Sequence, residues 1–255
     1  MAKGLDPLSG VPVYRQIAER LRERISSGEL QPGDRLPSEV ELMEAYSAAR
    51  ATVRQAVGLL RSEGLVLAEQ GRGAFVRDRP RVRRLAYDRF ARRHRKEGKA
   101  AFLAEMEGRR PEVEVLSVGP DAVPVAIADR LGVKPGDKVL RRHRRYLDAG
   151  QPLEIATSYI PWDLASGTPM TEVNPGPGGI YARIEELGHE LGRFVEDVTA
   201  RMPTLEEARA LGLSVGTPIL HLVRTAYDTD GTPVEVCDTV MAADRYVLNY
   251  ELPAG

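Results

Sequence analysis

Hydrophobic side chains recur at every fourth residue near the start of the chain, at Val13, Ile17, Leu21 and Ile25. Charged residues fill most of the positions between them. This spacing predicts an amphipathic helix that ends at Gly28, and its apolar stripe requires other elements to pack against it.

Two shorter helices and a hairpin are predicted next. Ser38 can accept hydrogen bonds from the first amides of a helix while Glu41 reaches back to the backbone, which predicts a helix over residues 39–46. Apolar positions predict a third helix over residues 50–62, and glycines between two apolar runs predict a hairpin over residues 66–76. Three helices followed by a hairpin form a winged helix-turn-helix.

The second half of the chain contains an internal repeat with a period of 80 to 81 residues. Leu131–Gly136 aligns with Leu211–Gly216, and each copy reads as helix, strand, turn and strand. The alternation in the strands predicts an antiparallel sheet backed by helices, so that two related halves form one α+β domain. The equivalent positions include Arg144 and Arg224, Asp148 and Asp228, Pro152 and Pro233, and Glu154 and Glu235.

Composition limits the class of protein. A chain of 255 residues suits two domains, and no apolar run approaches the roughly 18 to 20 residues of a membrane span. The N-terminus has no apolar signal core, one cysteine (Cys237) can form no internal disulfide, and the four histidines lack metal-ligand spacing. We expect a cytoplasmic protein with no membrane segment, no metal and no cofactor.

The net charge of −1 hides an uneven distribution. Residues 1–80, 81–110 and 111–255 carry net charges of +1, +7 and −9. Overall neutrality therefore does not exclude a nucleic-acid partner, because the field along one face decides binding. The basic stretch at residues 79–110 is either a solvated linker or helix, or a segment that adds phosphate contacts through Arg92, Arg93 and Arg95.

The N-terminal pattern also fits recognition of DNA. A helix in the major groove reaches base edges with its first residues, where Arg50, Thr52 and Arg54 lie. The glycines of the hairpin let its backbone approach the sugar-phosphate wall, with Arg72 placed to enter the narrower groove.

This segment resembles the GntR family of bacterial regulators, on the motifs Tyr14–Ile17, Gly33–Glu39, Ala51–Ala56 and Gly71–Val76. By that resemblance, the DNA contacts fall on Arg35, Ser38, Glu39, Arg50, Thr52, Arg54, Gln70, Gly71, Arg72 and Gly73. Val40 stands where an arginine commonly contacts phosphate, and Ala49 stands where a serine usually caps the third helix. We expect these departures to weaken DNA binding without abolishing it.

The second half, over residues 100–252, resembles the UTRA effector-binding domain of the HutC subfamily of GntR regulators, which shares the fold of chorismate lyase. The resemblance implies an effector cleft lined by Arg144, Tyr146, Tyr181 and Glu235, and the repeat adds Glu154. Sugar-phosphate-sensing members have an arginine at position 146, a carboxylate at 156 and a serine at 179. The tyrosine, alanine and glycine found here leave a phosphate clamp incomplete and favour a flatter or more apolar ligand. Alternatively, Arg144, Arg224, Glu154 and Glu235 form symmetric ion pairs that brace the hairpins.

These observations predict a winged helix-turn-helix DNA-binding domain over residues 1–78, a basic linker and start of the effector domain over 79–110, and a UTRA-like effector-binding and dimerisation domain over 111–255. The expected function is a repressor that binds a short inverted repeat of operator DNA as a homodimer and leaves it when a small-molecule effector binds. A DNA-binding dimer whose C-terminal domain senses nothing is one alternative. A chorismate-lyase-like enzyme is another, although no nucleophile-base pair, metal cluster or phosphate-binding glycine loop is present to support it.

Overall fold

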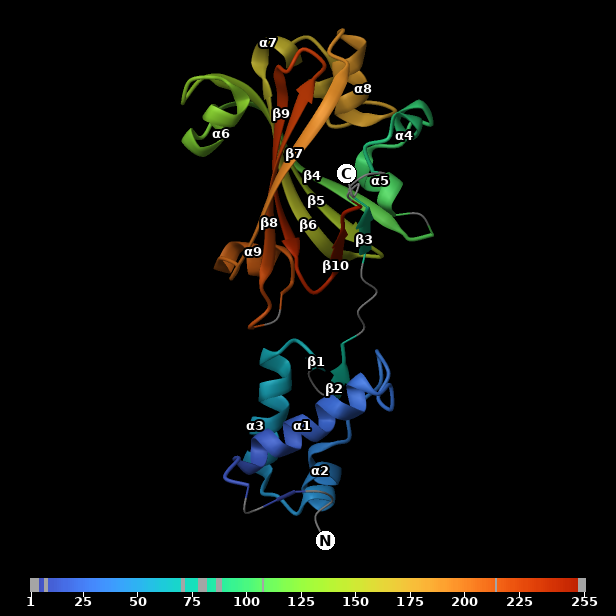
Figure 1. Ribbon diagram of the computed structural model, residues 1–255, viewed down its shortest axis with the longest axis vertical. Coiled ribbons are helices and arrows are strands. Elements are labelled where there is room, and N and C mark those ends of the chain that lie inside the picture. The colour runs from blue at the N-terminus through green and yellow to red at the C-terminus, as the bar shows by residue number, and fades with distance from the viewer. Residues whose placement is uncertain are drawn as a thin grey trace. The chain divides into compact units, whose positions relative to one another are not determined.

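The computed structural model describes residues 5–6, 9–69, 72–77, 82–85, 89–106, 108–213 and 215–251 (Figure 1). The chain divides into two compact units. The first, N-terminal unit covers residues 1–80 and 213–217, and the second, C-terminal unit covers residues 81–212 and 218–255. Among the helices that the structure describes, none is long and apolar enough to cross a membrane.

The N-terminal unit consists of three helices and a hairpin, as predicted. The helices are α1 (Val13–Ser26), α2 (Glu39–Tyr46) and α3 (Arg50–Ser62), and β1 (Val66–Glu69) pairs antiparallel with β2 (Gly73–Val76). The predicted apolar faces meet in one core, and its most buried members include Ile17, Leu21, Leu42, Val53 and Leu60.

The start of α2 shows why this helix begins where it does. Ser38 accepts a hydrogen bond from the amide of Glu41, and the Glu41 carboxylate accepts one from the amide of Ser38 over 2.7 Å. These reciprocal bonds satisfy two backbone donors that the helix itself leaves free. They also hold the Glu41 carboxyl pKa below its ordinary value, because the charged form accepts both the backbone and the side-chain bond.

The C-terminal unit contains a six-stranded antiparallel sheet in the order β4-β5-β6-β9-β8-β7. Its strands are β4 (Pro111–Ala122), β5 (Lys138–Asp148), β6 (Gln151–Pro161), β7 (Leu191–Arg201), β8 (Ile219–Asp228) and β9 (Pro233–Ala242). Strands β4, β5 and β6 form one half of the sheet, and β7, β8 and β9 form the other. Each half runs from an edge strand to a central strand, and an approximate twofold axis passes between β6 and β9.

The repeat predicted from the sequence is visible in this order, with one strand more per copy. α6 (Val125–Leu131) precedes β5 and β6, and α9 (Leu205–Ala210) precedes β8 and β9. The edge strands β4 and β7 complete the two copies. The sequence pattern did not predict them, because most of their side chains stay exposed or half-buried and show no clear alternation.

The two faces of the sheet carry different elements (Figure 1). α6 and α9 lie on one face, while α4 (Arg92–Lys96), α5 (Ala101–Glu105) and α8 (Gly179–Glu186) lie on the other. The short α7 (Trp162–Ala165) and the 3-10 helix η1 (Pro169–Thr171) follow β6. On the same side as α5, β3 (Val82–Leu85) pairs in parallel with β10 (Tyr246–Asn249).

The prediction of a solvated linker was wrong for part of the basic stretch. Its described residues form β3, α4 and α5, and the side chains of Arg84 and Arg89 are 2% and 5% exposed. Arg95 is also buried, and its guanidinium pairs with Glu185 through two hydrogen bonds of 2.9 and 3.0 Å. These arginines belong to the interior of the C-terminal unit, and Arg95 is not available for DNA phosphate.

Candidate functional site

The predicted DNA-contacting arginines of α3 share one carboxylate. Glu39, the first residue of α2, accepts a hydrogen bond from Nε of Arg54 over 2.8 Å and lies 3.3 Å from Nε of Arg50. The arginine side chains are 58% and 65% exposed, at positions 50 and 54. The two guanidinium groups are thus held at the start of the helix and remain accessible.

Other predicted contacts lie on or beside the hairpin. The backbone of Arg35 bridges to Phe75, and the Arg35 guanidinium packs so closely on Gly73 that an added Cβ there would lie 3.0 Å from Nε. The Arg72 guanidinium lies 5.5 Å from the centre of the Phe75 ring. Thr52 is half-buried on α3. The remaining two predicted contacts, Gln70 and Gly71, fall outside the described residues.

The two departures from the family pattern have visible local effects. Ala49 has the extended backbone of an N-cap residue, with φ −65° and ψ 151°, but makes no side-chain cap. The first turn of α3 therefore lacks the bond that Ser38 supplies to α2. Val40 is 52% exposed on α2 and offers no donor to a phosphate.

A cavity of about 380 Å³ lies in the C-terminal unit, on the sheet face that carries α4, α5 and α8. Its floor comes from β5, β6, β8 and β9. All five residues predicted to bind an effector line it, namely Arg144, Tyr146, Glu154, Tyr181 and Glu235. Three further arginines lie in its wall: Arg89 and Arg142, which the sequence analysis missed, and Arg224, which it named only as the repeat equivalent of Arg144.

The start of α8 and the segment between α4 and α5 meet at this cavity. Gly178 donates its N–H to the carbonyl of Gly98 over 2.9 Å. Gly178 has φ +77°, and a Cβ there would lie 2.7 Å from that of Ala182, so the position requires glycine. Because Gly179 and Ile180 also line the cavity, the positive end of the α8 dipole faces it.

Arg142 is a structural member of the wall. Its side chain is almost fully buried and donates to the carbonyls of Met170, Glu172 and Val173. Burial, with a smaller effect from Arg144, lowers the pKa of this guanidinium to about 10. Its charge contributes to the field of the cavity, while most of its donors are already used.

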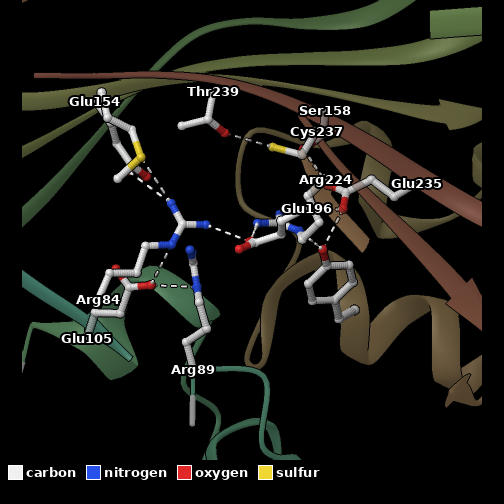
Figure 2. Close-up of polar contacts among 12 residues, drawn as sticks. Arg84, Arg89, Glu105, Glu154, Ser158, Glu196, Arg224, Glu235, Cys237 and Thr239 are labelled. Atoms are coloured by element: carbon white, nitrogen blue, oxygen red, sulfur yellow. Dashed lines mark hydrogen bonds and ion pairs between the residues drawn. The ribbon is translucent and has the colours of Figure 1, made fainter. Parts of the chain in front are cut away.

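The repeat-equivalent arginines Arg144 and Arg224 are joined through one carboxylate. Arg144 donates to Ser158, which donates to Oε1 of Glu235 over 2.6 Å. On the other side, Arg224 donates from Nε to the Tyr181 hydroxyl over 3.1 Å, and that hydroxyl donates to Oε2 of Glu235. Burial raises the pKa of Tyr181 well above its ordinary value, which keeps the donating proton in place. Figure 2 shows the Arg224, Glu235 and Ser158 part of this chain.

The charges of the two arginines are compensated differently. Arg224 lies 3.7 Å from both Glu196 and Glu235. Among the side chains that the structure describes, no carboxylate pairs with Arg144, which otherwise lies 5.7 Å from the centre of the Tyr146 ring. The symmetric ion pairs considered from the sequence are therefore formed on one side only, and Arg144 has no carboxylate partner among the described side chains.

Glu154, the repeat equivalent of Glu235, has a different partner. Its carboxylate lies 3.8 Å from Arg84 of β3 rather than beside Arg144. No local sequence signal identifies this pair, because the two residues are 70 positions apart and a buried arginine looks like a surface one in a sequence. In the part of the chain that the structure describes, no three His, Cys, Asp or Glu side chains are grouped as a metal site requires.

Comparison with known families matches both units. Residues 13–76 match the model of bacterial regulatory proteins of the gntR family, and residues 106–247 match the UTRA domain. The chain belongs to the GntR family. This GntR protein is 33% identical over 94% of its length to an uncharacterised HTH-type transcriptional regulator of Streptomyces coelicolor, of which the match covers 92%.

Two further similarities support the same assignment. The HTH-type transcriptional repressor NagR of Bacillus subtilis is 32% identical, over 94% of both chains. A crystal structure of a GntR-family transcriptional regulator superposes with a TM-score of 0.65 and 31% identity, over 96% of this chain and 98% of that one. The GntR protein is thus a helix-turn-helix transcriptional regulator with a UTRA domain, and the enzyme alternative finds no support.

Proposed function

We propose that this GntR regulator is a cytoplasmic repressor of the HutC subfamily that releases operator DNA when a small organic anion occupies the cavity. The observation that carries the effector part is Arg144, whose guanidinium faces the cavity without a carboxylate partner among the described residues. A buried cation of this kind favours an anionic ligand, because pairing recovers part of the free energy lost on desolvation.

The DNA-binding part of the proposal uses the N-terminal unit. Arg50 and Arg54 would contact base edges or phosphates at the start of α3, with Thr52 beside them, while Arg35, Arg72 and Gly73 would approach the backbone from the hairpin. Glu39 would hold the two α3 arginines in place, and Ser38 would cap α2. Gln70 and Gly71 remain predicted contacts.

The operator and the oligomeric state follow from this mode of binding. A short inverted repeat presents two equivalent half-sites, and two recognition helices match them only in a symmetric dimer. We assign the dimer contact to the C-terminal domain. The domain bounds of residues 1–78, 79–110 and 111–255 belong to the same proposal.

The lining of the cavity narrows the class of effector. Arg144, the start of α8 and the field of Arg142 would hold one anionic group. Tyr146, Phe102 and apolar side chains of β4 and α8 form much of the remaining wall. A carboxylate or phosphate on a flat or partly apolar body fits this arrangement, with Tyr181 and Glu235 fixing the orientation of Arg144.

Thermal shift with organic carboxylates and phosphate monoesters, followed by an operator mobility-shift assay, tests the proposal. We expect an anion that raises the melting temperature and releases DNA, and we expect Arg144→Met to remove both effects. Arg141→Met is the matched control, because its side chain lies on the opposite face of the same strand. Equal responses in Arg144→Met and the unmodified protein would contradict the site, and DNA binding that no such anion changes would favour the non-sensing dimer.

A further inference from the structure

A buried arginine forms an ionic contact between β3 and the rest of the C-terminal unit, beside Val82 of the same strand, which is buried in the apolar core. Arg84 is 2% exposed, and its guanidinium meets three carboxylates from three elements (Figure 2). Nη2 lies 3.1 Å from Glu196 of β7, Nη1 lies 3.8 Å from Glu154 of β6, and Nε lies 3.8 Å from Glu105 of α5. Among the strands that the structure describes, β3 pairs with β10 alone, and this ionic contact connects it directly with the six-stranded sheet.

Each of the three acidic side chains either lines the cavity or contacts an arginine that lines it. Glu154 lines it. Glu196 pairs over 3.7 Å with Arg224, and Glu105 pairs over 2.5 Å with Arg89, and both of these arginines line the cavity. A charge in the cavity would therefore act on the surroundings of Arg84 through Glu154 directly and through the arginine partners of Glu196 and Glu105.

The internal repeat makes the special position of Glu154 clear. Its equivalent, Glu235, accepts hydrogen bonds from Ser158 and Tyr181 and organises the arginines of the cavity. Glu154 does not repeat this role, because its nearest cation belongs to β3. The two repeat-equivalent carboxylates therefore have different partners. Glu235 contacts residues around the cavity, and Glu154 contacts Arg84 on the strand that begins the C-terminal unit.

We propose that Arg84 is a positioning residue that couples occupancy of the cavity to the attachment of β3. The proposal rests on the proposed function, since it takes the cavity as the effector site. A negative charge in the cavity attracts Arg84 strongly, because this region is shielded from water. The charge also draws Arg224 toward itself and away from Glu196, which leaves more of that carboxylate for Arg84. Both effects tighten the hold on β3.

The coupling can be tested in the full chain without an effector, by placing a fixed negative charge in the cavity. Ala156 lines the cavity, is 3% exposed and lies directly opposite Arg144 on the neighbouring strand. Ala156→Asp would put a carboxylate beside that guanidinium, and Ala156→Asn is the matched neutral control. Hydrogen exchange of the β3 and β10 amides then reports how firmly β3 is held.

We expect Ala156→Asp to slow exchange of the β3 amides about tenfold relative to Ala156→Asn, and Arg84→Met to reduce that difference to less than twofold. Equal slowing with and without Arg84, or no slowing with Arg84 present, would overturn the coupling. If Arg84→Met does not melt cooperatively, Glu154→Gln takes its place, since it keeps the side-chain volume and removes one of the three contacts. In the Glu154→Gln background, the proposal is supported if the difference in exchange rate between Ala156→Asp and Ala156→Asn falls to about fivefold or less. An unchanged difference contradicts it.

The result of the exchange experiment can be interpreted independently of the test of the proposed function. No effector enters the exchange experiment, so a failed coupling leaves the anion-release test with Arg144→Met unaffected. Conversely, a regulator whose DNA binding responds to no anion would show the exchange result unchanged.

Discussion

Arg54 of α3 donates a hydrogen bond from Nε to the carboxylate of Glu39, the first residue of α2, over 2.8 Å. The same carboxylate holds Arg50. The two helices of the helix-turn-helix are therefore linked at the place where α3 presents its first side chains. The pairing restricts the rotamers of the long arginine side chains, which would lower the entropy lost if they contact DNA as proposed.

Arg54→Ala is expected to weaken operator binding by about 1–3 kcal/mol, because a guanidinium contact to a base or phosphate is lost. The stability of the folded chain should change by less than about 1 kcal/mol, since the pair with Glu39 is well exposed. Fluorescence anisotropy with an operator fragment measures the affinity. Arg61→Ala, on an exposed position at the other end of α3, is the control and should bind normally. Unchanged affinity in Arg54→Ala would remove this residue from the DNA interface.

Ala49→Ser is expected to stabilise the N-terminal unit by about 0.5–2 kcal/mol, because it adds the missing cap to α3 on a backbone that already has cap geometry. Ser38→Ala should destabilise it by a similar amount, since it removes the cap of α2. Urea denaturation followed by circular dichroism measures both. Changes of the same sign in the two variants would show that the caps do not limit the stability of these helices.

Arg144→Met and Arg224→Met should differ sharply in stability although the residues are repeat equivalents. Removing Arg224 leaves Glu196 and Glu235 buried with a partner lost, a change that typically costs about 3–5 kcal/mol. Removing Arg144 leaves only Ser158 without a donor, so the loss should stay near 1 kcal/mol. Denaturant melts of the full chain compare the two, and a larger loss in Arg144→Met would contradict the charge assignment of the cavity.

The stability of the C-terminal unit should fall as pH rises from about 5 to 8. Burial raises the pKa of Glu105 to about 8 from its ordinary 4.5, because the penalty of desolvating the carboxylate exceeds the attraction of Arg84. The folded state therefore binds more protons than the unfolded chain in this window, and the free energy of unfolding decreases by at most about 1.4 kcal/mol per pH unit. Glu105→Gln should remove this dependence.

Glu207→Gln is a control in which the carboxyl pKa is lowered rather than raised in the folded state. Hydrogen bonds from Arg201 lower the pKa of Glu207 to about 2, so its contribution to stability is present above pH 4.5 and is lost as the pH falls toward 2. The variant should differ from the unmodified protein at neutral pH and converge with it in acid. Thermal melts at matched ionic strength follow both variants, and a flat profile for the unmodified protein between pH 5 and 8 would contradict the expectation for Glu105.

Local sequence patterns were sufficient to predict much of the fold. The capping pair of Ser38 and Glu41 gave the start of α2, and the paired turns at residues 148–152 and 228–233 gave the two central hairpins. Both features depend on residues a few positions apart, where sequence spacing and distance in space agree. The edge strands β4 and β7 lack such a pattern, because neither of their faces is consistently buried.

The candidate site was predictable in part. The residues that the UTRA resemblance selected line one cavity, and Glu154, which repeat symmetry added, lines it as well. Arg84, Arg89 and Glu105 were missed because their burial depends on partners from distant strands, such as Glu196. Their charges made the segment look like a solvated linker, whereas opposite charges from other elements neutralise them.

The approximate twofold axis between β6 and β9 has a consequence for how such regulators diversify. Duplication of one β-α-β-β unit supplied two arginines and two carboxylates around the same point of the sheet. Tyr146 and the carboxylate beside Arg84, Glu154, lie in the same copy and directly opposite each other on β5 and β6, while the second copy carries Arg224 and Glu235. A substitution that reshapes the cavity beside Tyr146 therefore falls next to the residue that contacts β3, so the cavity wall and the hold on β3 would change together rather than independently.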